Sequence, residues 1–436
     1  MRPLAKHGYR LPPMAWWLLV VSGFFHLSIS LSNTFINIFV FKVDHSFAAI
    51  AWYNLLVFIC LPFTFVLAGW MARMTSTAMS LRIGIALHAV FYAITLMVGE
   101  RAAKMPALLG ILMGFAAGFY WLAFDVLSVE YTDKGGHEPF FGIHGVVTSI
   151  SSVIAPPIAG VLISREDAFL GGLTGYHIVF GISFALFLAA TILSFRLRSA
   201  PMSRLHILRG FSKLKSSPWW RLMAASSIYG MREGVFMFLI GLLVFLATGS
   251  EMKLGEFLLL QGGLSFLAFF LAGRWSGKFR SRLFTSGAIG MAIAATLFLV
   301  PIRAPSIVIY GCISAASLPF FLVPLQGFVY DGMESMPDKD MPTSTHIIVR
   351  ESFENLGRIT GIVLFLVICR HQSPGNLGKL SWLSFALGLT QLGAWAVLRP
   401  VLNRIGGKRP GGRKHTNEGK LEKTSSGARK RLNPTS

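Results

Sequence analysis

The sequence predicts an all-α integral membrane protein that crosses the bilayer twelve times. The first observation is a series of long apolar stretches, each of about 20 residues or more, as ~30 Å of hydrocarbon requires at ~1.5 Å per helical residue. The second is composition, because 53% of the residues are hydrophobic and only 14% are charged. The stretches are continuously apolar and show no alternation, so we expect helices and not a barrel.

The twelve expected spans follow one another along the chain with short connections. They cover residues 15–41, 46–71, 79–99, 106–130, 140–163, 176–196, 219–247, 255–279, 282–301, 305–330, 343–369 and 378–402. The first span is longer than the apolar core of a signal peptide and has no small-x-small cleavage site, so we expect it to remain in the chain.

The distribution of basic residues predicts the orientation. Of the 40 Lys and Arg residues, 29 fall in segments on the side of the N-terminus, 8 on the opposite side and 3 inside spans. This bias follows the positive-inside rule, so we expect both termini in the cytoplasm. The net charge of +21 therefore predicts contact with anionic lipid headgroups and not a nucleic-acid partner.

A basic segment divides the spans into six and six. The tripeptide Leu67-Ala68-Gly69 near the end of the second span recurs as Leu271-Ala272-Gly273 near the end of the eighth. Such an echo indicates a duplicated bundle, which places a binding site between the repeats. We expect a cytoplasmic tail, a six-helix bundle, a basic cytoplasmic linker, a second six-helix bundle and a basic disordered cytoplasmic tail, at 1–14, 15–197, 198–218, 219–402 and 403–436.

The chain resembles the major facilitator superfamily (MFS) over essentially its whole folded length. That family has the motif G-x-x-x-D-R-x-G-R-K in loop 2–3 and again in loop 8–9. Here Gly69 and Gly273 keep its first glycine, but Arg73 and Gly277 stand at the Asp position, so the motif is degenerate. The resemblance implies two pseudo-symmetric six-helix bundles and alternating access.

The family's exporters often carry a second motif in the fifth span, G-x8-G-x3-G-P-x2-G-G. Small residues and the proline stand at the same spacing here, as Gly142, Ser151, Ala155, Pro156, Ala159 and Gly160. Small residues let helix backbones approach closely. The resemblance therefore implies a bacterial exporter of the drug or metabolite type. The alternative is that a small-residue face with a proline serves only helix packing, as in any bundle.

Ionisable residues inside spans are the strongest functional signal. Each costs about 2.5–3.5 kcal/mol at the centre of a membrane helix, so these groups must pair or face water. The resemblance places the seventh span at the central cavity. We expect Glu233 and Glu354 to couple transport to protons and Arg232 to bind substrate. The alternative is a static ion-pair network. We expect the remaining members of a charge network to be Arg350, Arg358, Asp125 and Arg73.

A polar stripe follows one face of the first span. Its members recur at spacings of three and four residues, as Ser22, His26, Ser30, Asn33 and Asn37. We expect His26, Asn33 and Asn37 to bind substrate together with Trp121 of the fourth span. The alternatives are hydrogen bonds between helices for the amides and the imidazole, and packing for the aromatic side chain.

The sequence contains no phosphate-binding loop with a lysine, no metal-ligand cluster and no nucleophile–base spacing. The three cysteines, Cys60, Cys312 and Cys369, all fall inside spans. We therefore expect neither an enzyme nor a cofactor nor a metal site, but a monomeric secondary active transporter of the cell membrane that exports a small molecule against H⁺. The alternatives are a non-transporting scaffold or sensor of the same fold, and an uptake permease or lipid-linked flippase.

Overall fold

The computed structural model describes residues 11–132, 137–170, 173–202, 206–212, 217–334, 343–369 and 377–405. Within these ranges every regular element is a helix, and twelve helices are long and apolar enough to cross a membrane. This confirms the predicted class. The helices are α1 (Pro13–Asp44), α2 (Phe47–Met74), α3 (Thr77–Val98), α4 (Glu100–Ala103), α5 (Pro106–Glu130), α6 (His137–Leu170), α7 (Thr174–Ser194), α8 (Ile207–Ser212), α9 (Ser217–Thr248), α10 (Glu251–Ala295), η2 (Thr296–Leu299), α11 (Ala304–Glu334), α12 (Thr343–Cys369), α13 (Gly378–Gly388) and α14 (Thr390–Ile405).

Short turns with local caps connect many of the spans. The hydroxyl of Ser46 accepts a hydrogen bond from the backbone of Ala49 at the start of α2, and Ser76 does the same at the start of α3. These side chains satisfy backbone N–H groups that have no partner within the helix. Gly99 ends α3 with φ +60°, a conformation that L-residues other than glycine rarely adopt. Successive spans are therefore antiparallel, although within the first half α2 packs mainly on α5, and α1 mainly on α6 and α7.

All twelve expected spans are present, and two of them differ in detail from the expectation. The eighth and ninth spans, Glu251–Ser276 and Phe279–Leu299, are two helices that follow one another within α10 across a kink at Phe279 (φ −126°, ψ 25°). No proline or left-handed residue stands at this kink. The last span is divided at Leu389 into α13 and α14. Elsewhere the spans begin and end within a few residues of the expected positions.

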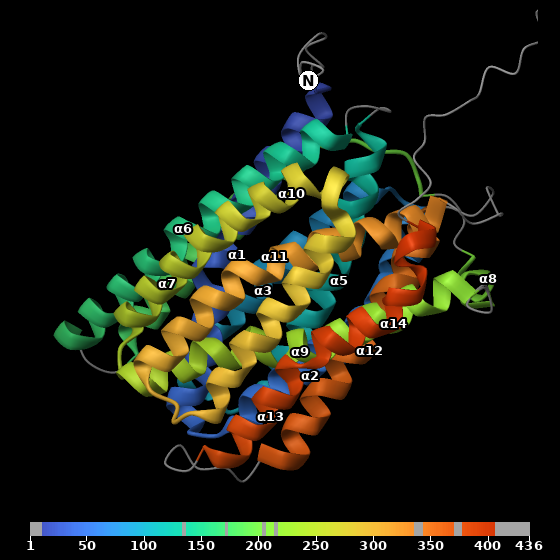
Figure 1. Ribbon diagram of the computed structural model, residues 1–436. Coiled ribbons are helices and arrows are strands. Elements are labelled where there is room, and N and C mark those ends of the chain that lie inside the picture. The colour runs from blue at the N-terminus through green and yellow to red at the C-terminus, as the bar shows by residue number, and fades with distance from the viewer. Residues whose placement is uncertain are drawn as a thin grey trace, which may run out of the picture.

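The helices pack as two groups, α1–α7 and α9–α14, joined by the segment that contains α8 (Figure 1). The largest contacts between the groups are those of α6 with α10 and of α2 with α12. Because each group crosses six times, the start of α1, the segment with α8 and the end of α14 lie at the same end of the bundle. We call this the linker end, and the other the far end.

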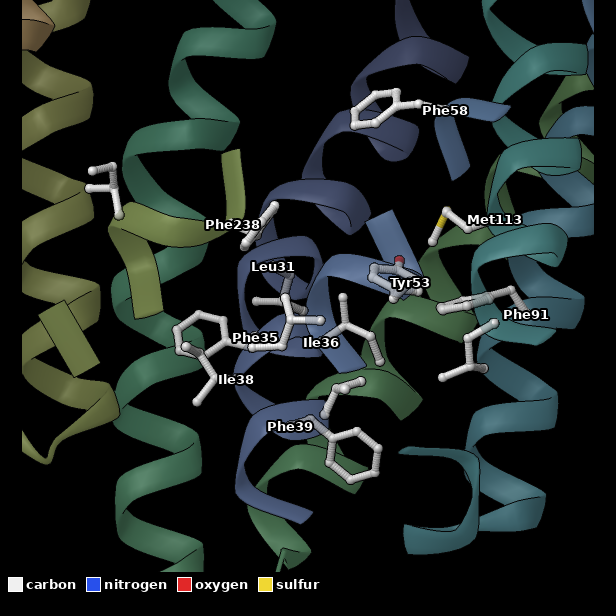
Figure 2. Close-up of a cluster of buried hydrophobic side chains, with 14 of the residues drawn as sticks. Leu31, Phe35, Ile36, Ile38, Phe39, Tyr53, Phe58, Phe91, Met113 and Phe238 are labelled. Carbon is white, nitrogen blue, oxygen red and sulfur yellow. The ribbon is translucent and has the colours of Figure 1, made fainter. Parts of the chain in front are cut away.

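A buried apolar core lies where the groups meet. Figure 2 shows side chains from α1, α2, α3 and α5 packed together with Phe238 of α9. Phe35 and Ile36 on α1 are fully buried in it. This packing holds α1 between its own bundle and α9, so polar groups beside this core lie on the surface between the two halves.

Candidate functional site

A cluster of charged side chains lies between α9 and α12, with Arg358 at its centre. The Nε of Arg358 donates to Oε2 of Glu233 at 2.7 Å, and its Nη2 donates to Oε1 of Glu354 at 2.6 Å. Its Nη1 lies 3.6 Å from Oε2 of Glu351 and donates to Oδ1 of Asn355 at 3.0 Å. One guanidinium therefore contacts three carboxylates. These side chains are only 12–28% exposed, so solvent screens them little.

Glycines bring the two helices of this cluster into close contact. Gly357 and Gly361 of α12 lie against the backbone of α9, and Gly230 and Gly234 of α9 lie against the backbone of α12. A Cβ atom at any of the four positions would overlap the facing helix. Close approach of two helices at small residues is the usual way in which membrane helices associate. This close approach of α9 and α12 places Glu233 within reach of Arg358.

The charge cluster extends along α12 to the first half of the protein. Arg350 forms an ion pair with Glu351 on the same helix. Both groups act electrostatically on the carboxyl group of Asp125 on α5. In addition, Arg358 lies 5.2 Å above the ring of Phe58 on α2. The cluster therefore contacts both halves of the bundle. A pair of charges buried within one half would contact that half alone.

The cluster contains more carboxyl groups than guanidinium groups. Arg350 and Arg358 face four carboxyl groups, which are Asp125, Glu233, Glu351 and Glu354. Such an excess of like charge disfavours the fully ionised state in a poorly solvated environment. An arrangement of this kind favours the uptake of a proton by one of the carboxylates.

Arg73, an expected member of the network, lies outside the cluster, and so does Arg232, which we expected to bind substrate. Arg73 is exposed at the end of α2 and forms no ion pair with any described residue, because α2 ends there at the surface. Arg232 is 5% exposed and points away from Glu233, as neighbours on a helix lie about 100° apart. Its Nη2 donates to the hydroxyls of Tyr310 at 2.7 Å and Ser314 at 3.0 Å, both on α11.

The amides of the polar stripe on α1 have different environments. The Oδ1 of Asn37 accepts a hydrogen bond from Nδ2 of Asn54 at 2.8 Å, and its own Nδ2 donates to the carbonyl of Asn33 at 3.1 Å. Asn37 is 4% exposed, so it ties α1 to α2, the alternative that the sequence left open. The side chain of Asn33 is half-buried and forms no hydrogen bond with a described residue. Asn33 therefore keeps its hydrogen-bonding groups available.

The structure brings His26 and Trp121 together with His144, which we had not selected. The ring centroids of His26 and Trp121 lie 5.7 Å apart, and those of His26 and His144 lie 5.1 Å apart. The Nε2 of His144 is 2.9 Å from the hydroxyl of Ser22. The Nε2 of His26 is buried and has no hydrogen-bond partner among the described residues. The signal that would have found His144 was an imidazole near the start of an apolar span.

A second set of charges joins the two halves at the far end. Lys42 of α1 forms an ion pair with Glu251 of α10, with Nζ 2.7 Å from Oε1. The hydroxyl of Tyr176 on α7 donates to the same oxygen at 2.9 Å. We call these three residues the far-end latch. Sequence analysis did not select these residues, because Lys42 and Glu251 stand near the ends of spans, where charged residues are common.

No group of three or more His, Cys, Asp or Glu side chains that could hold a metal ion occurs in the described part of the chain. The functional groups are instead ion pairs and polar side chains on the surfaces between two helical bundles. Twelve spans in two halves, with charges buried where the halves meet, define a multi-pass membrane transporter.

The chain belongs to the Major Facilitator Superfamily, whose sequence model matches residues 18–367. It is 36% identical over 355 residues to the uncharacterized protein YqgE of Bacillus subtilis (strain 168), covering 81% of this chain and 82% of that protein. It is also 43% identical over 163 residues to an uncharacterized protein in the sodM 3′ region of Geobacillus stearothermophilus, covering 37% of this chain and 74% of that protein.

Solved transporter structures share the fold. The nucleoside transporter NupG superposes with a TM-score of 0.65 at 15% identity, covering 89% of this chain and 99% of that one. A bacterial homologue of the iron transporter ferroportin, in an outward-facing state with soaked iron, superposes with a TM-score of 0.63 at 12% identity, covering 91% and 99%. At these identities the likeness extends to the fold alone.

Proposed function

We propose that this protein is a proton-coupled exporter of a small molecule, working by alternating access in a bacterial cell membrane with both termini in the cytoplasm. The observation that carries the proposal is the contact of Arg358 with Glu233, Glu351 and Glu354 between α9 and α12. In this proposal the protein acts as a monomer, and its basic segments contact anionic lipid headgroups.

The coupling step follows from the geometry of Arg358. When Glu233 on α9 and Glu354 on α12 are both ionised, both accept hydrogen bonds from this guanidinium: the bond to Glu233 joins α12 to α9, and the bond to Glu354 orients Arg358 on its own helix. Protonation of either carboxylate removes a charge-assisted hydrogen bond and loosens the contact. The same guanidinium lies over the ring of Phe58 on α2, in the first half, so a change in its pairing alters a contact between the halves. In this proposal, proton binding thereby shifts the equilibrium between two arrangements of the halves, which is what coupling requires.

The packing of α6 supports export over uptake. Its small residues lie against α10, where Gly160 meets the backbone at Glu251 and Gly255 meets the backbone at Pro156 and Pro157. This is the surface that the exporter-like motif of the fifth span supplies. In this proposal the half-buried Asn33, His26 and Trp121 contribute to a substrate path from the first half.

We expect Glu233→Gln and Glu354→Gln each to abolish proton coupling, because an amide keeps the shape of the carboxyl group but cannot take up a proton. Compounds whose accumulation in cells falls on expression of the protein are first selected from a panel of toxins and metabolites. In everted vesicles with an acidified lumen, each such compound should cause proton efflux, reported by an acridine dye. The rate should fall at least about ten-fold in both variants.

The matched control is Glu256→Gln, which makes the same chemical change in an exposed ion pair with Lys253 at the far end. It should transport as the unaltered protein does. Intact proton efflux in both cluster variants would show that the coupling assignment is wrong. Compounds that accumulate more when the protein is present would show uptake, and a protein that moves no compound in the panel would point to the scaffold alternative.

A further inference from the structure

A cavity of about 320 Å³ lies at the linker end, where α3, α5 and the segment before α8 meet α12. This volume falls in the range of small-molecule sites, roughly 300–1,000 Å³. Most of its wall is apolar, including Val126 of α5, Met202 of the linker and Ile347 of α12. Two carboxyl groups, those of Asp125 and Glu130, also line it.

The polar groups of this cavity have unused hydrogen-bonding capacity. The carboxyl group of Asp125 makes no hydrogen bond and no ion pair within 4.0 Å with any residue that the structure describes. Glu130 accepts one hydrogen bond, from the backbone of Ala200 at 3.3 Å. Thr77 is fully buried, and its hydroxyl has no partner among the described residues. Glu130 is exposed and Asp125 is half-buried. Because buried polar groups are normally satisfied, the Thr77 hydroxyl and the Asp125 carboxyl are the groups that a ligand in the cavity would satisfy.

The ionisable side chains that line the cavity are acidic. Its lining contains no Lys, Arg or His among the described residues. The basic group that acts on Asp125 is Arg350, and it is already paired with Glu351. Arg82 on α3 donates to the carbonyls at the end of α7 and beyond, at Ser194 and Leu197. Within the described part of the chain, Arg350 and Arg82 are thus held by other partners, and no Lys, Arg or His forms an ion pair within 4.0 Å with either carboxyl group.

We propose that this cavity binds an amphiphilic organic cation, and that it is the entrance by which such a substrate reaches the path between the halves from the linker end. Apolar walls bury the hydrocarbon part, and the carboxylates of Asp125 and Glu130 offset the positive charge. This inference rests on the proposed function, because it takes transport to start from the linker end. It adds the chemical class of the substrate.

Binding of benzyltrimethylammonium to the full-length protein in lipid nanodiscs tests this inference, with empty nanodiscs as the blank in calorimetry. The cation should bind saturably. Neopentylbenzene, which has the same shape without the charge, and benzenesulfonate, which has the opposite charge, should not. Asp125→Asn and Glu130→Gln should each weaken binding of the cation about ten-fold, because each leaves one carboxylate.

A third variant separates shape from charge. Ala200→Trp keeps both carboxylates and the backbone N–H but fills the cavity, so it should abolish binding. Glu256→Gln, outside the cavity, should not alter it. All variants should elute as folded protein in size-exclusion chromatography. Equal binding of the cation in Asp125→Asn, Glu130→Gln and Ala200→Trp, or equal binding of the neutral isostere, would overturn the inference.

The two proposals fail in different ways. Absence of saturable cation binding, together with proton efflux that depends on Glu233, overturns the entrance site and leaves the coupled exporter in place. Cation binding that depends on Asp125 and Glu130, without proton-driven movement of any compound, supports the site and overturns the coupling.

Discussion

The Arg358→Leu variant is expected to lose about 3–5 kcal/mol of stability, because it removes the guanidinium and leaves buried carboxylates without their counter-charge. Glu233, Glu351 and Glu354 would then face one another across α9 and α12 at distances at which like charges repel. Thermal unfolding of the purified protein in detergent, followed by size-exclusion chromatography, measures the loss as a lower midpoint.

Two further variants establish the cause of that loss. Arg101→Leu makes the same substitution at an exposed position of α4, and it should change stability by less than about 0.5 kcal/mol. Adding Glu233→Gln to Arg358→Leu should restore part of the stability, because it removes one uncompensated charge. If Arg358→Leu were as stable as Arg101→Leu, the cluster would not be the buried ionic contact described above.

The sequence predicted the fold because the bilayer imposes a simple rule. Spans had to be about 20 apolar residues long, so hydropathy alone located all twelve. The rule does not fix the form of a connection. It predicted two spans here, but not that they meet at a kink at Phe279 without a loop between them.

Local spacing predicted part of the charge cluster. Glu354 and Arg358 stand four residues apart on one helix, and they form the expected pair. Spacing could not show that Arg232 and Glu233, adjacent in sequence, would turn toward different helices. Nor could it place Asp125 opposite α12, because that contact depends on how the two halves meet.

The far-end latch was beyond sequence reasoning for the same reason. Lys42 and Glu251 are 209 residues apart, and neither position differs in composition from any other span end. The polar stripe on α1 shows what a spacing pattern on one helix can and cannot predict. Spacing placed its members on one face of a helix, but it could not name their partners: Asn37 accepts from Asn54 of α2, and Ser22 contacts His144 of α6.

Opening of the far end is expected to require the loss of the far-end latch, and Lys42→Glu should therefore open it. Glu251 is 8% exposed and accepts from both Lys42 and Tyr176 of the other half. Hydrogen bonds to charged groups contribute about 1.5–3 kcal/mol, which corresponds to a shift of roughly ten-fold to a hundred-fold in a two-state equilibrium. A second carboxylate at position 42 adds repulsion across the same surface.

Thiol labelling measures this shift. The three native cysteines are replaced by Ala, and a single cysteine is introduced at Asn33, whose side chain is half-buried on α1. A maleimide that cannot cross the membrane is added to intact cells, on whose outer surface the far end lies in the proposed orientation. Labelling in Lys42→Glu should be at least about ten-fold faster than in the same background with Lys42.

The exchange of both charges decides whether the ion pair itself closes the far end. Lys42→Glu combined with Glu251→Lys recreates the pair in the opposite sense and should return labelling to the slow rate. Lys253→Glu reverses a charge at the same end, in a pair whose side chains are 54% and 52% exposed, and solvent screening should leave its labelling unchanged. Slow labelling in Lys42→Glu, or fast labelling in the exchanged pair, would show that the far end is held by the α6–α10 packing and not by this contact. The latch matters to transport for a physical reason. Its contact joins one oxygen of the largely buried Glu251 to both α1 and α7 and is either intact or broken, and this gives the closed far end a defined free energy that substrate and proton binding must overcome.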